Sequence, residues 1–197
     1  MTKSAIGVLE ARARRCRRCS LHRTRTNVVF GSGPSEADVM LVGEAPGRME
    51  DLAGLPFVGA AGRRLNRLLR MSRLKRNEVH ITNVVLCRPP ENRRPTPGEI
   101  EACRIFLEKR ISAVGPRVIV ALGKTASETL LGRKVKMAED HGKLFESGAG
   151  GGADIFVTYH PAAALYSGKA LKVMEGDFKK LGELVRRISR CGCADRL

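Results

Sequence analysis

Three side chains that could take part in chemistry interrupt or follow apolar segments of strand length. The segment Val39–Gly47 is an apolar run that ends in a Gly/Pro turn, and Glu44 is the one ionisable residue in that turn. Asn83 interrupts a second run that is rich in β-branched residues, and His160 ends another. A carboxylate can position water, an amide can donate and accept hydrogen bonds at once, and an imidazole can donate a proton. These residues are the first candidates for a binding or catalytic site.

Each candidate also has a structural interpretation that the sequence leaves open. Asn83 could be a buried amide whose hydrogen bonds are satisfied within the protein. Glu44 could be a loop carboxylate that faces water, and His160 could start a helix without binding a ligand. Phe57, which lies close to glycines and a proline, could be an ordinary core residue.

Four cysteines form a second candidate group. Cys16 and Cys19 are separated by two residues, and Cys87 and Cys103 flank a proline-rich loop and the start of a helix. An intracellular α/β protein is a poor setting for a disulfide framework, whereas four thiolates can bind a zinc ion or an iron–sulfur cluster. The spacing does not distinguish the two metals. Cys103 alone would be interpreted as a core residue, because it lies on the apolar stripe of a helix.

The segments that position these residues alternate between strand and helix patterns. Short apolar runs begin near residues 38, 79, 117 and 154, and helical patterns lie between them. Such βαβ units predict a parallel sheet covered by helices on both faces, in a single domain that spans residues 1–197. The clearest helix begins with a capping box at Thr96 and ends before Gly115, whereas Asp51–Gly59 is expected to be an irregular loop. Open α/β sheets bind ligands at the carboxyl ends of their strands, which is where the turn containing Glu44 is expected to lie.

The charge of the chain indicates an acidic partner. The 197 residues include 36 Lys+Arg against 20 Asp+Glu, which gives a formal net charge of +16 at pH 7. This excess favours nucleic acid over a membrane surface, although a cationic surface kept for solubility is the alternative. Aromatic residues make up only 4% of the chain, which argues against a platform that stacks successive bases. No apolar run approaches the ~20 residues of a membrane span, so we expect an intracellular, cytoplasmic protein that associates with nucleic acid.

The string Gly123-Lys-Thr125 follows the third apolar run and invites comparison with a phosphate-binding loop. The glycine that such a loop requires five residues earlier is absent, because Val118 occupies that position. The sequence therefore does not favour a phosphate-loop function.

Five motifs together resemble those of family-four uracil-DNA glycosylases, the iron–sulfur class of that superfamily. They occur in the same order as in that family and extend the resemblance over nearly the whole chain. They are Gly43-Glu-Ala-Pro-Gly47 followed by Glu50-Asp51, Pro56-Phe-Val-Gly59, Thr82-Asn83, Cys87-Arg-Pro-Pro90 and Tyr159-His-Pro-Ala-Ala163.

The resemblance implies a fold, a cofactor and an activity. The fold would be a three-layer α/β/α sandwich around a central four-stranded parallel sheet. The cofactor would be a [4Fe-4S] cluster, and the activity would be hydrolytic excision of uracil from DNA by a monomeric repair enzyme that leaves an abasic site. The residues that would bind the cluster are Cys16, Cys19, Cys87 and Cys103.

The resemblance also assigns roles in the site. Phe57 would stack on a flipped uracil, Asn83 would recognise its polar edge, and the Ala45 N–H would help to frame the base. His160 would donate a hydrogen bond to uracil O2 as charge develops there, and Glu44 would position or deprotonate the attacking water.

Opening the duplex would be the task of the segment after His160. By the same resemblance, the segment from Pro161 to Tyr166 would enter the minor groove, with Leu165 as the wedge into the emptied stack.

Two other functions remain compatible with the sequence. One is a metal-stabilised nucleic-acid-binding module that uses the same basic surface without catalysis. The other is a glycosylase for another deaminated base, because Asn83 alone does not define the pocket. Release of free uracil, and its loss when Glu44 or His160 is replaced, would separate these possibilities.

Overall fold

The computed structural model describes residues 5–145 and 152–191 and contains one five-stranded sheet. The strand order is β2-β1-β3-β5-β4, and the first four of these strands run parallel. The bounds of the strands are β1 (Val39–Gly43), β2 (His80–Asn83), β3 (Val118–Leu122), β4 (Leu144–Phe145) and β5 (Asp154–Thr158).

The prediction of a parallel sheet is confirmed, but the strand number differs from the four that were expected. The additional strand, β4, is only Leu144–Phe145 and pairs antiparallel with β5 at the edge of the sheet. A two-residue strand cannot show the alternation of polar and apolar residues by which strands are recognised in a sequence.

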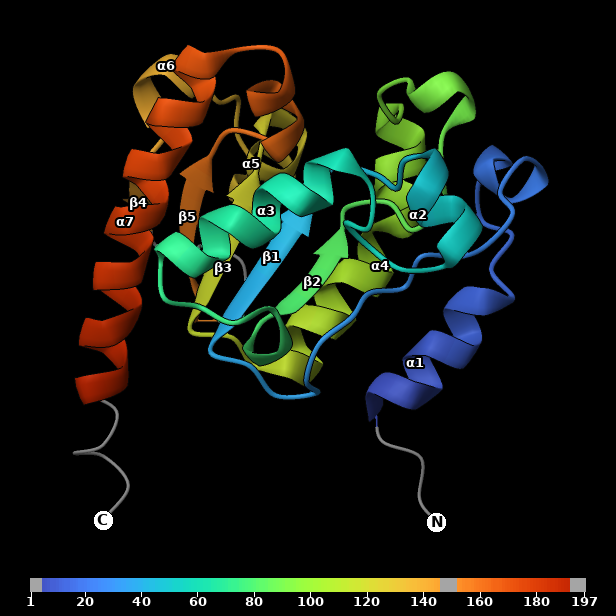
Figure 1. Ribbon diagram of the computed structural model, residues 1–197. Helices are drawn as coiled ribbons and strands as arrows, with labels where there is room; N and C mark the ends of the chain where they lie inside the picture. Colours follow the sequence, from blue (N-terminus) through green and yellow to red (C-terminus); the bar gives the residue numbers. More distant parts are fainter. Residues whose placement is uncertain (1–4, 146–151, 192–197) are drawn as a thin grey trace.

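Helices cover both faces of the sheet and complete three layers (Figure 1). The apolar side chains of α3 and α7 pack on one face, and those of α1, α4 and α5 pack on the other. Along β1, Met40 and Val42 belong to one of these cores and Leu41 to the other, because successive side chains of a strand point to opposite faces. The bounds of the five helices are α1 (Ala5–Arg14), α3 (Ala60–Met71), α4 (Pro97–Val114), α5 (Lys124–Leu131) and α7 (Gly168–Cys191).

Helix α4 begins and ends where its sequence signals predict. The Thr96 hydroxyl accepts a hydrogen bond from the Glu99 N–H at 3.3 Å, and the Glu99 carboxylate accepts one from the Thr96 N–H at 2.8 Å. This reciprocal capping satisfies two backbone donors that the first turn leaves without helical partners. Gly115 ends the helix with φ 60°, a left-handed conformation that glycine adopts at low cost.

The segment Asp51–Gly59, which was expected to be an irregular loop, begins inside a short helix, α2 (Arg48–Ala53). Asp51 is buried on this helix, and its carboxylate accepts hydrogen bonds from the backbone N–H groups of Thr26 and Asn27 at 3.0 and 3.2 Å. The acidic residue therefore attaches the N-terminal segment to the turn that follows β1. Its role is structural.

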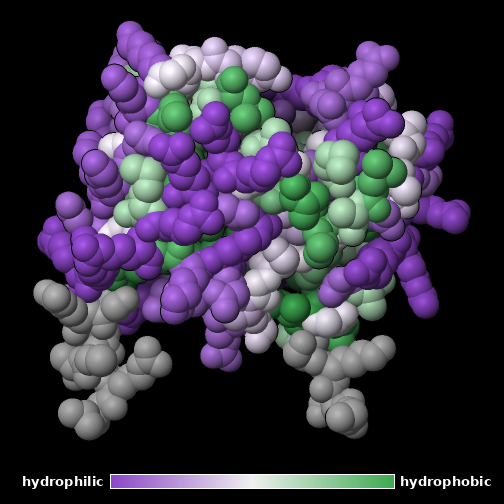
Figure 2. Space-filling model, in the orientation of Figure 1, coloured by the Kyte–Doolittle hydropathy of each residue, from purple (hydrophilic) through white to green (hydrophobic). Residues whose placement is uncertain are grey.

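The remaining short elements lie in the connections between the strands and the longer helices. They are α6 (Met137–Asp140) and the 3-10 turns η1 (Ser20–Arg23), η2 (Arg76–Glu78), η3 (Pro90–Asn92) and η4 (Pro161–Leu165). Within the described ranges, no helix is both long enough and apolar enough to cross a bilayer. Hydrophilic side chains cover most of the face that carries α3 and α7 (Figure 2).

Candidate active site

The carboxyl ends of the parallel strands bring the predicted site residues together. Gly43, the last residue of β1, pairs with Asn83, the last residue of β2. Asn83 therefore ends its strand, whereas the sequence pattern placed it inside a longer one. His160 follows β5 by two residues, and its Cβ lies only 2.9 Å from where a Cβ on Gly123 would stand. The ends of β1, β2, β3 and β5 thus meet at one edge of the sheet.

This edge contains a cavity of about 510 Å³. Its volume lies in the range of sites that hold small molecules. Five residues that were expected to act on the base line it: Glu44, Ala45, Phe57, Asn83 and His160. The cavity is also lined by residues for which we expected no role in the site, among them Glu50, Arg93, Arg94 and Lys124.

The absence of a side chain at Gly43 allows two walls of the cavity to approach each other. A Cβ at this position would lie 2.4 Å from Asn83 Oδ1 and 2.7 Å from Phe57 Cζ, closer than van der Waals contact permits. The glycine in the first motif is therefore required by the packing of the two residues that would hold a base.

Phe57 is held in an unusual backbone conformation. Its φ is 52°, which is uncommon for a residue other than glycine, and its side chain is buried. The Glu50 carboxylate accepts hydrogen bonds from the next two N–H groups, those of Val58 at 3.0 Å and Gly59 at 2.8 Å. The Phe57 ring lies 5.7 Å from the His160 ring at an angle of 32°. Glu50 thus fixes the turn that presents Phe57 to the cavity.

The side-chain oxygen of Asn83 is an acceptor for which the described residues supply no donor. The residue is buried, and its Oδ1 makes no hydrogen bond within the described part of the chain. A buried amide oxygen without a donor costs on the order of 1–3 kcal/mol. Because Asn83 lines the cavity, a bound ligand with an N–H group can remove this cost.

His160 is arranged as a neutral hydrogen-bond donor. The Ala162 N–H donates to His160 Nδ1 at 3.2 Å, so the proton of the neutral imidazole is on Nε2. Burial lowers the pKa of His160 below its usual 6.5, although the nearby carboxylates Glu44 and Glu50 act in the opposite direction. The imidazole therefore stays neutral at pH 7 and has one N–H to offer.

Glu44 is held by residues that the sequence did not indicate. The Thr125 hydroxyl donates a hydrogen bond to Glu44 Oε2, and Arg94 Nε lies 3.7 Å from the same oxygen. The Glu44 carbonyl accepts from the Val85 N–H at 3.2 Å, which attaches the turn to the segment after β2. Thr125 belongs to the Gly-Lys-Thr string that does not meet the phosphate-loop pattern. A hydrogen bond between residues so far apart leaves no signal in the sequence.

The four predicted cysteine ligands line one narrow cavity of their own. All four are free thiols, contributed by the N-terminal segment, the loop after β2 and helix α4. Among the described residues, no three His, Cys, Asp or Glu side chains form a group that could hold a metal ion. A cluster of several irons differs from a single ion, because its ligands surround a volume and do not converge on one point. The donor set and its placement around a shared cavity fit such a cluster.

The cysteine cavity is basic as well as apolar. Arg25 Nη1 donates a hydrogen bond to Cys87 Sγ at 3.1 Å. Burial raises the pKa of the Cys87 thiol, and the hydrogen bond from Arg25 acts in the opposite direction. Burial also raises the pKa of the Cys103 thiol, to about 12. Without a metal these thiols are neutral at pH 7, so metal binding there must displace protons.

The segment after His160 presents different side chains from those expected. Leu165, the predicted wedge, is partly buried at the end of η4 and does not line the cavity. Tyr166 lines the cavity and is 90% exposed. Leu165 as a wedge stays a prediction, and Tyr166 is an exposed ring at the end of the segment that was expected to enter the minor groove.

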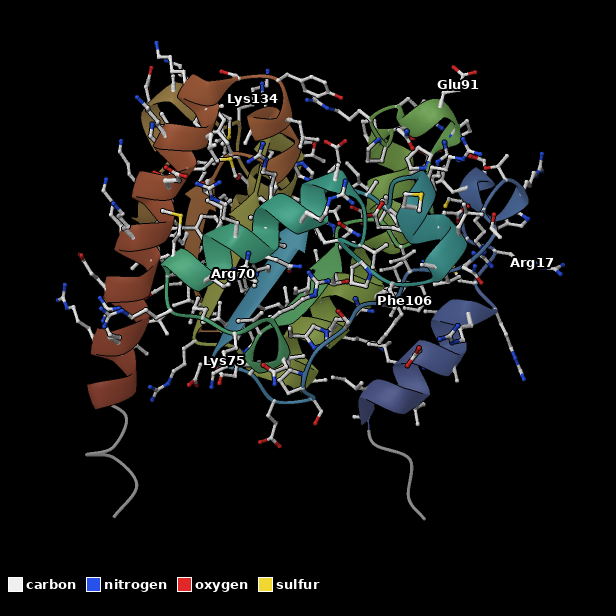
Figure 3. The ribbon with its side chains drawn as sticks, viewed as in Figure 1. Arg17, Arg70, Lys75, Glu91, Phe106 and Lys134 are labelled. Carbon is white, nitrogen blue, oxygen red and sulfur yellow. The ribbon has the colours of Figure 1, made fainter. Side chains whose placement is uncertain are left out.

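The basic residues of α3 and the following turn are only partly free to bind phosphate. Arg70 and Lys75 are exposed along the outer side of this segment (Figure 3), but Lys75 pairs with Glu78 at 2.8 Å. Arg67 pairs with Glu175 at 3.4 Å, and Arg76 donates to the Asn66 side chain and to the Pro56 carbonyl. Arg76 thus supports the fold.

Comparison with known proteins agrees with the geometry of the site. Residues 30–181 match the uracil DNA glycosylase superfamily, and the chain belongs to that superfamily. The type-4 uracil-DNA glycosylase of Archaeoglobus fulgidus is 45% identical over 174 residues, which are 86% of this chain and 87% of the relative. The corresponding Thermotoga maritima protein is 40% identical over 91% of this chain and 94% of its own length. Within the superfamily, the chain is a member of the type-4 family.

A more distant branch is also similar. The type-5 uracil-DNA glycosylase of Thermus thermophilus is 34% identical over 151 residues, which cover 67% of this chain and 68% of the relative. The two type-4 relatives are more similar to this chain, and over more of its length, than this type-5 protein is. This difference confirms the predicted family.

Proposed function

We propose that this protein excises uracil from DNA by hydrolysing the bond between uracil N1 and the sugar C1′. The observation that carries the proposal is the convergence of Glu44, Asn83 and His160 on one cavity at the carboxyl edge of the sheet. This cavity offers a carboxylate for water, an amide for the base and a neutral N–H for the leaving group. The chain's membership of the type-4 family supports the same activity.

The cavity favours uracil through the hydrogen-bonding pattern of Asn83 and the position of Phe57. The unpartnered Asn83 Oδ1 would accept from uracil N3–H, and the amide NH₂ would donate to O4. Cytosine presents an acceptor at N3 and a donor at C4, so the same amide orientation would repel it. Phe57 would stack on the flipped base, and the Ala45 N–H would frame it.

Departure of the base would depend on His160 and Glu44. As the N1–C1′ bond breaks, its electron pair leaves with uracil and negative charge develops on O2, where the His160 Nε2–H would donate. Such a donor contributes roughly 3 kcal/mol to lowering the barrier. Glu44 would orient a water toward C1′ and accept its proton as the new C–O bond forms. The products are free uracil and an abasic site.

Cys16, Cys19, Cys87 and Cys103 would hold a [4Fe-4S] cluster. When bound, the cluster would act as a covalent connection between the N-terminal segment, the loop after β2 and helix α4. The hydrogen bond from Arg25 to Cys87 would stabilise the thiolate form of that ligand.

The partner of this site would be uracil-containing DNA, bound by one copy of the chain. The formal charge of +16 supplies the attraction to phosphate, and Arg70 is among the exposed cations. Leu165 would act as the wedge that fills the space left by the flipped nucleotide.

A uracil-release assay tests the function. Purified protein should release free uracil from an oligonucleotide with one uracil, and alkali should then cleave the strand at the abasic site. His160→Ala and Glu44→Ala should slow release sharply while binding to the same oligonucleotide persists. Binding without release by the wild type would instead support a non-catalytic binding module. Faster release of hypoxanthine or xanthine than uracil would identify a glycosylase for another deaminated base.

A further inference from the structure

Thr125 stands apart from the other hydroxyl residues of its helix. Helix α5 carries three of them, and two donate to the backbone carbonyl four residues earlier: Ser127 to Gly123 at 2.9 Å and Thr129 to Thr125 at 2.8 Å. Such bonds are the usual arrangement for hydroxyl side chains in helices. Thr125 instead donates to Glu44 Oε2. Its hydroxyl therefore donates a hydrogen bond to a residue outside the helix.

The sheet explains why the two residues meet. Glu44 directly follows β1, Thr125 is the second residue of the helix that follows β3, and β1 pairs with β3 in parallel register. The first turn of α5 consequently lies beside the turn that holds Glu44. Thr125 is buried, with 5% of its surface exposed, so water competes little for its hydroxyl.

The two oxygens of Glu44 differ in their surroundings. Oε2 accepts from Thr125 and lies 3.7 Å from Arg94 Nε, whereas Oε1 has no hydrogen-bond partner among the described residues. The Arg94 side chain is 63% exposed, so this ion pair contributes little by itself and is open to exchange with DNA phosphate. Of these two partners, Thr125 is the buried one.

We propose that Thr125 is a positioning residue for uracil excision, because it fixes Oε2 of Glu44 and leaves Oε1 to bind the attacking water. This inference rests on the proposed role of Glu44. A carboxylate held by one oxygen keeps the other in a defined place, whereas a free carboxylate samples several rotamers. A catalytic group that must reach a water near C1′ depends strongly on such placement.

The central test compares Thr125→Val with Thr125→Ser. Valine keeps the shape of threonine and removes the hydroxyl, whereas serine keeps the hydroxyl. Thr125→Val should lower the single-turnover rate of uracil release by roughly 10- to 100-fold. Its Kd for an oligonucleotide with a non-cleavable 2′-fluoro-uridine should match that of the wild type. Thr125→Ser should restore most of the rate.

A matched control comes from the same helix. Thr129→Val removes a hydroxyl that bonds only to a carbonyl of its own helix, so the rate should stay within about twofold of the wild type. The melting temperature of each variant shows whether it is folded. If Thr125→Val does not fold, Thr125→Ala and Thr125→Ser provide the same comparison of a missing and a retained hydroxyl.

A double-mutant cycle separates the inference from the function on which it rests. In a Glu44→Ala background, Thr125→Val should cause no further loss, because the group it positions is gone. If Glu44→Ala alone leaves the rate unchanged, the proposed role of Glu44 fails. If Glu44→Ala slows release but Thr125→Val does not, or if Thr125→Val slows it equally in both backgrounds, the role of Thr125 is overturned.

Discussion

Replacing Gly43 by alanine should impair uracil excision although it removes no functional group. The new Cβ would lie 2.4 Å from Asn83 Oδ1 and 2.7 Å from Phe57 Cζ, whereas ordinary contact begins at 3.4 Å. Asn83 and Phe57 are 2% and 6% exposed, so neither side chain can turn freely into solvent. The Asn83 amide must therefore move by about 1 Å from the position in which it would meet the base.

The size of the effect follows from this displacement. A misplacement of about 1 Å in an active site can cost about 100-fold in rate, which corresponds to about 2.7 kcal/mol of lost transition-state stabilisation. The overpacking should also lower the free energy of unfolding by about 1–3 kcal/mol. Gly43 ends a strand with no left-handed φ, so alanine itself adds no backbone strain.

The assay is single-turnover uracil release with enzyme in excess, together with inhibition by free uracil. Gly43→Ala should lower the rate about 100-fold and weaken inhibition by uracil. Gly176→Ala is the matched control: it lies in α7, and its Cβ would have no atom within 4 Å. It should leave the rate unchanged and stabilise the helix by up to about 1 kcal/mol. A Gly43→Ala protein that releases uracil at the wild-type rate would refute the proposed contact between Asn83 and the base.

Four further predictions test the electrostatics, the cofactor and the wedge. The hydrogen bond from Arg93 is the main cause that lowers the Glu99 pKa to about 2. Glu99→Gln should therefore lower the free energy of unfolding, measured with urea at pH 7, by about 2–3 kcal/mol. This difference from the wild type should disappear as the pH falls from about 4.5 towards 2, because Glu99 of the wild type is then protonated. Burial lowers the pKa of His160, so its neutral form persists below pH 6.5. The rate of uracil release by the wild type should therefore not fall through protonation of His160 when the pH is lowered to 6.5. Cys103→Ser should reduce the iron content per chain and the broad visible absorption, whereas a colourless wild-type protein containing zinc would contradict the cluster. Leu165→Ala should slow release from duplex DNA more than from single strands, and equal slowing on both would exclude a wedge function.

Much of the fold was predictable because the strands and α4 carry strong local signals. The expected strand starts near residues 38 and 117 correspond to Val39 and Val118, since continuous apolar runs of strand length occur there. Helix α4 has its capping box and its terminal glycine within the sequence itself. By contrast, α2 is short, and the glycines and the proline that follow it resemble those of a loop. Its helical state depends on tertiary hydrogen bonds such as those of Asp51.

The site was predictable where it depended on motifs and unpredictable where it depended on contacts between elements. Glu44 and His160 could be selected because each follows a strand pattern, and Asn83 because it is a polar residue that interrupts one. The contact of Thr125 with Glu44 joins residues 81 positions apart, and a hydroxyl in a short helix has no periodicity that could reveal it. The same applies to Tyr166, whose 90% exposure depends on the way in which η4 packs.

The charges around the cavity support hydrogen bonding rather than ion pairing as the means of stabilising the departing base. Glu44 and Glu50 both line the cavity, and both favour the protonated form of His160, yet burial outweighs them and keeps the imidazole neutral. A protonated imidazole would form an ion pair with Glu44 and would compete for the carboxylate that must handle water. A neutral Nε2–H instead strengthens its hydrogen bond as charge grows on uracil O2, so its contribution is largest in the transition state.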